Sequence, residues 1–136
     1  MLNKRNLIML IAIIILATTV YINAQQETLL VSPGEVNKMI ANDTNIVLLD
    51  VRTVSEFNSE AGHLKSAYLI PVDELETRIN ELDKFKTRSM IVYCRSGHRS
   101  GIALPILLKH GFKVRNMEGG INRWNAEQLP VIKEIQ

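Results

Sequence analysis

Short apolar runs alternate along the chain with segments in which apolar residues recur at helical spacing. Five strands are predicted, at residues 28–31, 46–49, 68–70, 90–93 and 112–116, and those at 46–49 and 90–93 are apolar runs. The segments between them predict helices at residues 33–41, 53–57, 73–82, 102–109 and 121–126. Because strands that alternate with helices become parallel neighbours, the pattern predicts an α/β fold. We expect a doubly wound, five-stranded parallel sheet with helices on both faces.

Residue types at the ends of these segments support several boundaries. Ser32 can cap the first of these helices, and Pro33 suits its first turn. Ser100 is expected to cap or begin the helix at 102–109, in which Pro105 predicts a mild kink. Gly111 then ends that helix.

Residues 1–24 form a separate segment in front of the domain predicted for residues 25–136. Lys4 and Arg5 precede an apolar run at residues 7–22, a pattern typical of a bacterial export signal. A helix of about 16 residues spans only ~24 Å, against a hydrocarbon core of ~30 Å. Cleavage after Ala24 is therefore favoured over retention as a membrane anchor. In either case the basic residues stay inside, which places the domain in the periplasm or another extracytoplasmic space.

Composition narrows the classes of function. With 136 residues, 46% hydrophobic and 22% charged, the chain fits one globular domain. The formal net charge of +2 disappears when Lys4 and Arg5 are set aside, so no nucleic-acid-binding face is predicted. Cys94 is the only cysteine, which excludes an internal disulfide and a four-cysteine zinc site.

Cys94 stands where the apolar run at residues 90–93 stops and a helix follows. A loop of this kind aims backbone N–H groups and the positive end of a helix dipole at one point, which suits an anion. Gly97 allows backbone geometry that a β-carbon would obstruct, and Arg95 and Arg99 add two guanidinium groups. Such surroundings favour a thiolate. Cys94 is therefore predicted to be a reactive nucleophile rather than a small buried hydrophobic residue.

Four segments along the chain form a set. They are Leu49-Asp50-Val51-Arg52 with Glu56-Phe57, Gly62-His63-Leu64-Lys65-Ser66-Ala67, Cys94-Arg95-Ser96-Gly97-His98-Arg99-Ser100, and Glu118-Gly119-Gly120 with Trp124. In order and spacing they resemble the signatures of single-domain rhodaneses, a family of sulfurtransferases, over residues 28–131. Lys65 and Ser66 depart from the family pattern, in which Pro and Gly are usual at those positions.

The resemblance implies that Cys94 takes sulfane sulfur from a small anionic donor such as thiosulfate and holds it as a persulfide. The sulfur then passes to a thiophilic acceptor such as cyanide or a thiol, without any cofactor. Arg95 is expected to bind the donor. Arg99 is expected either to do the same or to pair inward with a carboxylate such as Asp50.

The other residues of the loop complete the predicted site. Gly97 and Ser100 shape it, and Ser96 and His98 are expected to line it rather than to catalyse. Asp50 and Arg52 are predicted to form a structural ion pair that braces the loop, because a free carboxylate there would oppose the thiolate.

Two residues outside the loop receive structural interpretations. His63 is expected to stabilise a turn, and Trp124 to be a core or interface aromatic.

Two other classes of function remain open. Phosphatases and arsenate reductases use the same fold, but their loops carry one more residue than the four between Cys94 and Arg99. The shorter loop disfavours that activity. A binding module or a persulfide carrier would look the same in sequence as the enzyme. A protein that accepts the sulfur or reduces the thiol is a further expected partner.

Overall fold

The computed structural model of the protein describes residue 1 and residues 3–133. Five parallel strands form one sheet in the order β1-β5-β4-β2-β3. They are β1 (Leu30–Val31), β2 (Val47–Asp50), β3 (Tyr68–Leu69), β4 (Ser89–Tyr93) and β5 (Lys113–Met117). The predicted five-stranded parallel sheet is confirmed. Residue 2 and residues 134–136, which belong to the predicted segments 1–24 and 25–136, lie outside the described residues.

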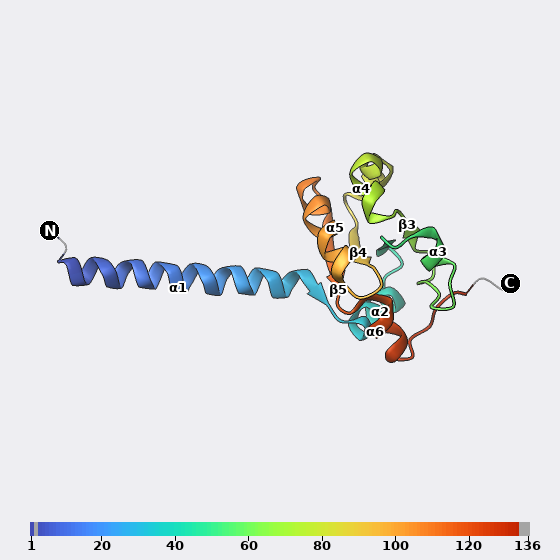
Figure 1. Ribbon diagram of the computed structural model, residues 1–136, viewed down its shortest axis with the longest axis horizontal. Coiled ribbons are helices and arrows are strands. Elements are labelled where there is room, and N and C mark those ends of the chain that lie inside the picture. The colour runs from blue at the N-terminus through green and yellow to red at the C-terminus, as the bar shows by residue number, and fades with distance from the viewer. Residues whose placement is uncertain (2, 134–136) are drawn as a thin grey trace.

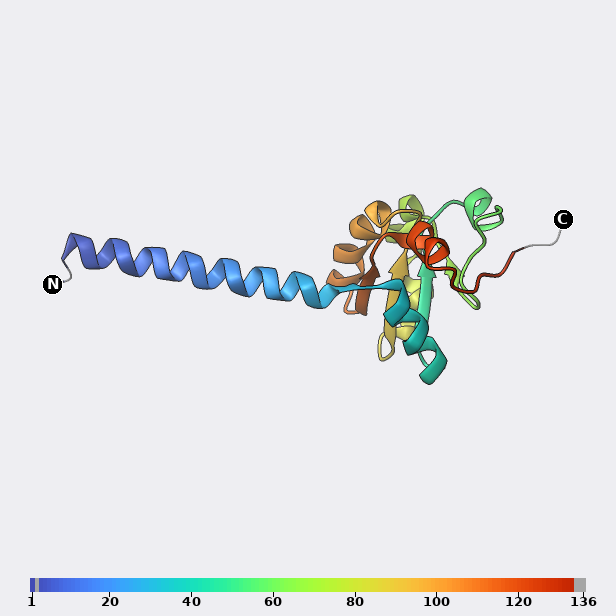
Figure 2. The same cartoon turned by 90° about the horizontal axis from the view of Figure 1, so that it is seen from below.

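Helices connect the strands and cover both faces of the sheet (Figures 1 and 2). They are α1 (Lys4–Leu29), α2 (Pro33–Asn42), α3 (Val54–Phe57), α4 (Val72–Arg78), the 3-10 helix η1 (Ile79–Phe85), α5 (His98–Lys109) and α6 (Gly120–Ala126). The buried residues of α4, η1 and α5 pack in one apolar cluster, and those of α2 and α6 pack in another. This is the two-sided covering that a parallel sheet requires.

The central strand β4 divides its side chains between these two clusters. Met90 and Val92 face the α4 and α5 side, whereas Ile91 and Tyr93 face the α2 and α6 side. All four are 1% exposed or less. Cys94 continues the alternation and turns toward α5. The strand therefore fixes the direction of the thiol.

Three predicted boundaries are wrong. Helix α1 continues to Leu29, so only the last two residues of the predicted strand at 28–31 form β1. The predicted helix at 73–82 begins at Val72 and tightens into a 3-10 helix at Ile79. Helix α5 begins at His98, because Gly97 serves as its N-cap in the left-handed conformation, with φ 99°. Ser100 therefore lies inside the first turn and does not cap it.

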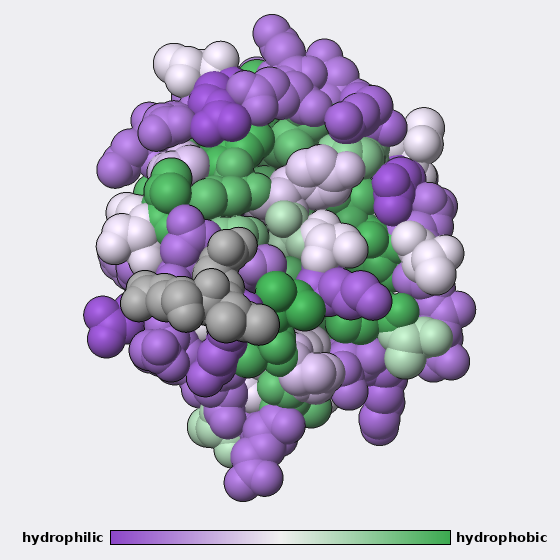
Figure 3. Space-filling view, turned by 90° about the vertical axis from the view of Figure 1, so that its right-hand side faces the viewer, coloured by the Kyte–Doolittle hydropathy of each residue, from purple (hydrophilic) through white to green (hydrophobic). Residues whose placement is uncertain are grey.

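Helix α1 stands away from the rest of the molecule (Figures 1 and 2). Its span Lys4–Ala24 is long and apolar enough to cross a membrane, and none of this span is buried against the domain. At ~1.5 Å per residue, these 21 residues cover about 31 Å, longer than the apolar run alone suggests. On the face of the domain turned away from α1, hydrophobic side chains gather across the middle and hydrophilic side chains lie around them (Figure 3).

Candidate active site

Cys94 lies at the carboxyl end of β4, enclosed by the loop that leads into α5. Its Sγ accepts a hydrogen bond from the Gly97 N–H at an N to S distance of 3.1 Å. The Ser100 hydroxyl, 3.4 Å from Sγ, is a second donor. The residue is only 1% exposed. Two donors that converge on a buried sulfur form a cradle suited to an anion.

These donors govern the ionisation of the thiol. Burial raises the pKa of Cys94, because a low-polarity environment disfavours the thiolate. Hydrogen bonds from the Ser100 hydroxyl and from the N–H groups of Ser100, Ser96 and Gly97 outweigh burial and lower the pKa below its ordinary value. The thiolate is therefore more populated at neutral pH than that of a free cysteine.

The amino end of α6 holds the start of the loop. The Ile121 N–H donates to the Cys94 carbonyl at 2.9 Å, and the Asn122 N–H donates to the Arg95 carbonyl at 3.0 Å. Gly120 makes this approach possible. A β-carbon there would collide with the Cys94 carbonyl oxygen and come within 2.7 Å of the Arg95 carbonyl, and its φ is +56°.

The two arginines of the loop have different surroundings. Arg99 pairs with Glu56 of α3 through two parallel hydrogen bonds of 2.7 and 2.6 Å. The carboxylate that Arg99 pairs with is therefore Glu56 and not Asp50, and this pair is partly exposed rather than directed inward. The Arg99 guanidinium lowers the pKa of Glu56 to about 2. Arg95 is exposed, and its guanidinium has no ion-pair partner within residues 3–133.

Asp50 and Arg52 form a buried ion pair next to this arrangement. Arg52 Nη2 lies 2.7 Å from Asp50 Oδ2, and the two side chains are 1% and 0% exposed. Arg52 also donates to the Gly62 carbonyl at 2.8 Å and to the Glu56 carbonyl at 3.2 Å. The pair thus braces residues 56–62, the segment that carries the Arg99 partner, and does not bond the Cys94 loop directly.

Comparisons with known proteins agree with this geometry. The model of the rhodanese-like domain family matches residues 32–127. The chain belongs to this family. A protein of Allochromatium vinosum named sulfurtransferase is 32% identical over 97 residues, which cover 71% of this chain and 87% of that protein.

Other relatives are longer than this rhodanese-like domain. The chain is 39% identical to a tRNA uridine(34) hydroxylase of Hamiltonella defensa, with 64% of this chain and 25% of that protein covered. It is 34% identical to the putative sulfur carrier protein YrkF of Bacillus subtilis, with 65% of this chain and 46% of that protein covered. The chain thus spans only a quarter to a half of these two relatives.

Solved structures show the same fold. A full-length protein from Lactobacillus plantarum superimposes with a TM-score of 0.74 at 28% identity, covering 87% of this chain and 98% of that one. The fold of this rhodanese-like sulfurtransferase and its family are therefore established by sequence and by structure.

The remaining predicted residues are peripheral to the sulfur. The side chains of Ser96 and His98 are exposed and make no hydrogen bond within residues 3–133. His63 stacks on Phe57 with ring centroids 3.7 Å apart, and its backbone bridges to Ile132. Trp124 is fully buried and donates to the Pro130 carbonyl at 3.1 Å. Trp124 is thus a core aromatic.

A hollow of about 240 Å³ lies beside the loop. It is lined by Arg52, Glu56, Ser59, Ala61, Arg95, Ile121 and Asn122. Arg95 contributes the unpaired cation of this lining, so the hollow gives an anionic molecule a place next to the Cys94 loop.

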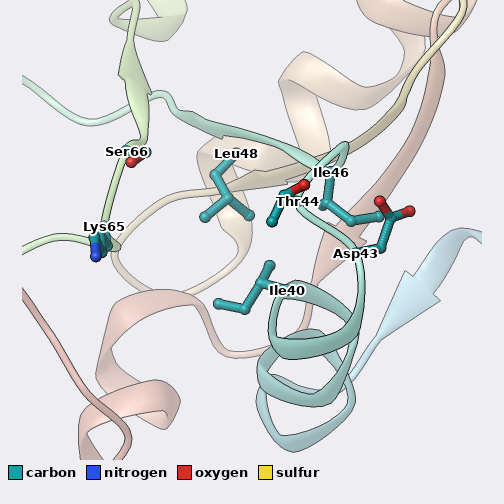
Figure 4. Close-up of a pocket in the computed structure, with 7 residues that line it drawn as sticks. All are labelled: Ile40, Asp43, Thr44, Ile46, Leu48, Lys65 and Ser66. Carbon is teal, nitrogen blue, oxygen red and sulfur yellow. The ribbon is translucent and has the colours of Figure 1, made fainter.

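A second hollow, of about 280 Å³, is formed by different elements (Figure 4). Ile40 of α2 and Leu48 of β2 point into it, and Lys65 and Ser66 lie on its other side (Figure 4). These last two are the residues that depart from the family pattern, and Ser66 has a left-handed φ of 61°. None of the predicted site residues lines this hollow.

Two residues at the site were not identified from the sequence as site residues. Glu56 could have been found, because Thr53 and Glu56 form a capping box at the start of α3 and the carboxylate is thereby aimed at the loop. Asn116, the penultimate residue of β5, reaches the Gly97 carbonyl. The only signal for it in the sequence is a polar residue near the end of a predicted strand. Among the described residues, no group of three or more His, Cys, Asp or Glu could hold a metal ion.

Proposed function

We propose that this chain is a thiosulfate-type sulfurtransferase in which Cys94 carries the transferred sulfur as a persulfide. The observation that supports this most strongly is the cradle of Gly97 N–H and Ser100 hydroxyl around a buried sulfur whose pKa is lowered. A thiolate held in this way is a ready nucleophile.

In the first half-reaction, the Cys94 thiolate attacks the outer sulfur of thiosulfate. A bond forms between that sulfur and Sγ while the S–S bond of the donor breaks, and sulfite leaves with the bonding electron pair. The persulfide carries the negative charge that the thiolate brought. The same N–H groups that lower the pKa of the thiol are placed to stabilise this charge.

In the second half-reaction, cyanide or a thiolate attacks the outer sulfur of the persulfide. The bond to Sγ breaks, and its electron pair returns to Cys94 as the thiolate. Thiocyanate or a new persulfide leaves. Electrons balance across the two steps, so the cycle needs no external oxidant, reductant or cofactor.

Arg95 is the proposed contact for the donor. Its guanidinium is unpaired and lines the hollow beside the loop, whereas the Arg99 guanidinium is occupied by Glu56. A planar guanidinium can bind two oxygens of a sulfonate at once. Because Cys94 is 1% exposed, only a small donor with a terminal sulfur fits this approach.

A persulfide carrier is the second candidate function. The similarity to a putative sulfur carrier favours it. A carrier would be loaded by thiosulfate or a partner but would turn over with cyanide far more slowly than with its protein acceptor.

The proposed location is extracytoplasmic, with α1 as either a cleaved signal or a membrane anchor. The length and exposure of Lys4–Ala24 support both, and a largely apolar helical span of 21 residues matches a ~30 Å hydrocarbon core better than the shorter run alone. Cleavage after Ala24 stays a prediction.

Thiosulfate-to-cyanide transfer by the wild type and by Cys94→Ser tests the proposal. The wild type is expected to form thiocyanate, and Cys94→Ser to lose at least a thousandfold of that rate (~4 kcal/mol) while it keeps its fold. Thiocyanate formation by the Ser variant would contradict the role of Cys94. Hydrolysis of an aryl phosphate by the wild type, without sulfur transfer, would favour the phosphatase alternative.

A further inference from the structure

Asn116, the polar residue near the end of β5, points at the underside of the Cys94 loop. It pairs with Val92 of β4, and Val114 two residues earlier packs in the same cluster as Val92 and Cys94. The alternation of β5 therefore places the Asn116 side chain on the face of the sheet that carries the thiol. The residue is 6% exposed, and its Nδ2 lies 3.4 Å from the Gly97 carbonyl oxygen.

The orientation of this amide follows from its partner. A carbonyl oxygen can only accept a hydrogen bond, so the Asn116 side chain must present its NH₂ group to Gly97. Its Oδ1 is then buried, and it accepts no hydrogen bond from the part of the chain that the structure describes. A buried amide that leaves its oxygen unpaired is unfavourable for folding alone, so a role at the loop is the better explanation.

The Gly97 carbonyl oxygen and the Cys94 sulfur compete for one proton. The Ser100 hydroxyl lies 3.2 Å from that carbonyl oxygen and 3.4 Å from Sγ. A hydroxyl has a single proton to donate, so it can satisfy only one of these acceptors at a time. The Gly97 carbonyl already accepts from the Gly101 N–H at 3.0 Å. A carbonyl oxygen has two lone pairs, and one of them thus remains to be filled.

We propose that Asn116 is a positioning residue that assigns the Ser100 proton to the Cys94 sulfur. When the Asn116 NH₂ fills the remaining lone pair of the Gly97 carbonyl, the Ser100 hydroxyl is left to donate to Sγ. Without Asn116, the hydroxyl divides its proton between the carbonyl and the sulfur. Asn116 thus acts on the reacting atom through Ser100 and touches neither donor nor acceptor.

The energetics of the loop support this arrangement. After burial, the Ser100 hydroxyl has the largest effect on the pKa of Cys94, and it lowers that pKa. The charged groups around the loop are Arg95 on the loop itself, Arg99 of α5, Glu56 of α3, Asp50 of β2, and Arg52, which pairs with Asp50. A neutral substitution of Asn116 changes none of these charges. A change in the pKa of Cys94 would therefore reflect a change in the hydrogen bond from the Ser100 hydroxyl.

The test is the ultraviolet titration of the Cys94 thiolate in the full chain, for the wild type and for Asn116→Leu. Leu has as many side-chain heavy atoms as Asn but no donor and no unpaired oxygen. We expect the pKa of Cys94 to rise by about half a unit to one unit, with no loss of thermal stability. The titration is repeated with Asn116→Ala, whose smaller side chain cannot crowd its neighbours, and the same rise in the pKa of Cys94 is expected.

Ser100→Ala tests whether Asn116 acts on the sulfur through the Ser100 hydroxyl. It should raise the pKa of Cys94 by itself, and adding Asn116→Leu to it should produce no further rise. Asn125→Leu is the matched control, because Asn125 Nδ2 donates to the Ala61 carbonyl at 2.9 Å away from the loop. That variant should lose stability and leave the titration unchanged.

Three results would overturn the inference. They are an unchanged pKa of Cys94 in both Asn116 variants, a full additional shift in the Ser100→Ala background, and loss of the fold in both Asn116 variants. Loss of the fold in both variants would show that Asn116 is required for the stability of the core. The inference rests on the proposed role of Cys94 as the reacting thiolate. Its readout is ionisation, however, so it can fail or succeed independently of sulfur transfer.

Discussion

At the scale of single residues, the two arginines of the Cys94 loop differ in what they can bind. Arg99 is 28% exposed and holds Glu56 with both of its terminal nitrogens, so its charge is already compensated. Arg95 lies in the lining of the hollow with its guanidinium free of any carboxylate in residues 3–133. An incoming anion therefore meets Arg95 first.

Replacing each arginine with alanine should separate donor binding from stability. Arg95→Ala should raise the KM for thiosulfate about tenfold, because a charge-assisted contact is lost, and leave the melting temperature nearly unchanged. Arg99→Ala should destabilise the fold by about 1–2 kcal/mol, because Glu56 loses both hydrogen bonds. Steady-state kinetics and thermal melts of the two variants check this. If Arg99→Ala has the larger effect on KM and Arg95→Ala the larger effect on melting, the two roles are reversed.

The Glu56–Arg99 pair also predicts an acid dependence of stability. The pKa of Glu56 falls from 4.5 to about 2 in the folded protein, first because of the Arg99 hydrogen bonds. A depressed carboxylate pKa stabilises the fold above the unfolded pKa, and this contribution is lost as pH falls through the folded pKa. Glu56→Gln should therefore cost about 1–2 kcal/mol at pH ~7, and the difference from wild type should shrink below pH ~4.5. Urea unfolding at several pH values measures this, and a difference that does not change with pH would contradict it.

At the scale of elements, two helix amino ends meet at the Cys94 loop. Helix α5 supplies Ser100 from its first turn, and α6 fixes the loop through the carbonyls of Cys94 and Arg95. Gly120 is the point of closest approach between α6 and the loop. The geometry of the cradle therefore depends on how closely α6 can dock.

Gly120→Ala should disrupt both the fold and the activity. The new β-carbon would press on the Cys94 and Arg95 carbonyls, and the alanine would have to keep an unfavourable positive φ. Together these effects should lower the free energy of unfolding by at least about 2 kcal/mol. Gly111→Ala is the matched control, because its φ is +84° but no atom lies within 4 Å of the added carbon. It should cost only ~1 kcal/mol and spare activity. Equal losses of stability and of sulfur-transfer activity in the two variants would show that the packing of α6 does not determine the geometry of the loop.

The elements themselves were largely predictable, and their ends were not. All five strands were located from the sequence, and the apolar runs of β2 and β4 gave the clearest signal, because a buried parallel strand needs apolar side chains on both faces. The start of α5 was missed because a left-handed Gly97 begins that helix with no side-chain cap, so the residue pattern gives no signal. The partner of Arg99 was also missed. Asp50 ends β2 and Glu56 follows it in α3. The sequence predicted that Arg52 pairs with Asp50, but only the fold shows that Glu56 lies within reach of Arg99.

At the scale of the whole molecule, an exposed apolar helix is joined to a folded sulfurtransferase domain (Figure 1). The sequence predicted the segment, but it understated its length, because the helix includes residues on both sides of the apolar run. None of the span Lys4–Ala24 is buried in the domain, and its length and composition fit either a membrane span or a signal sequence.

Fractionation of cells that express the full chain tests the proposed export. We expect the domain either in the membrane fraction at full mass or in the extracytoplasmic fraction at the mass left after cleavage. Protease added to cells with a permeabilised outer envelope should digest the domain in both cases. Full-length protein that remains soluble and protected in the cytoplasm would contradict export.

The central claim is that Cys94 holds the transferred sulfur, and intact mass analysis of the full chain tests it most directly. The protein is incubated with thiosulfate, freed of donor and measured before and after the addition of cyanide. We predict a gain equal to the mass of one sulfur atom, removed by cyanide and absent in Cys94→Ser. A wild-type mass that thiosulfate does not change, or an equal gain in Cys94→Ser, would contradict the claim.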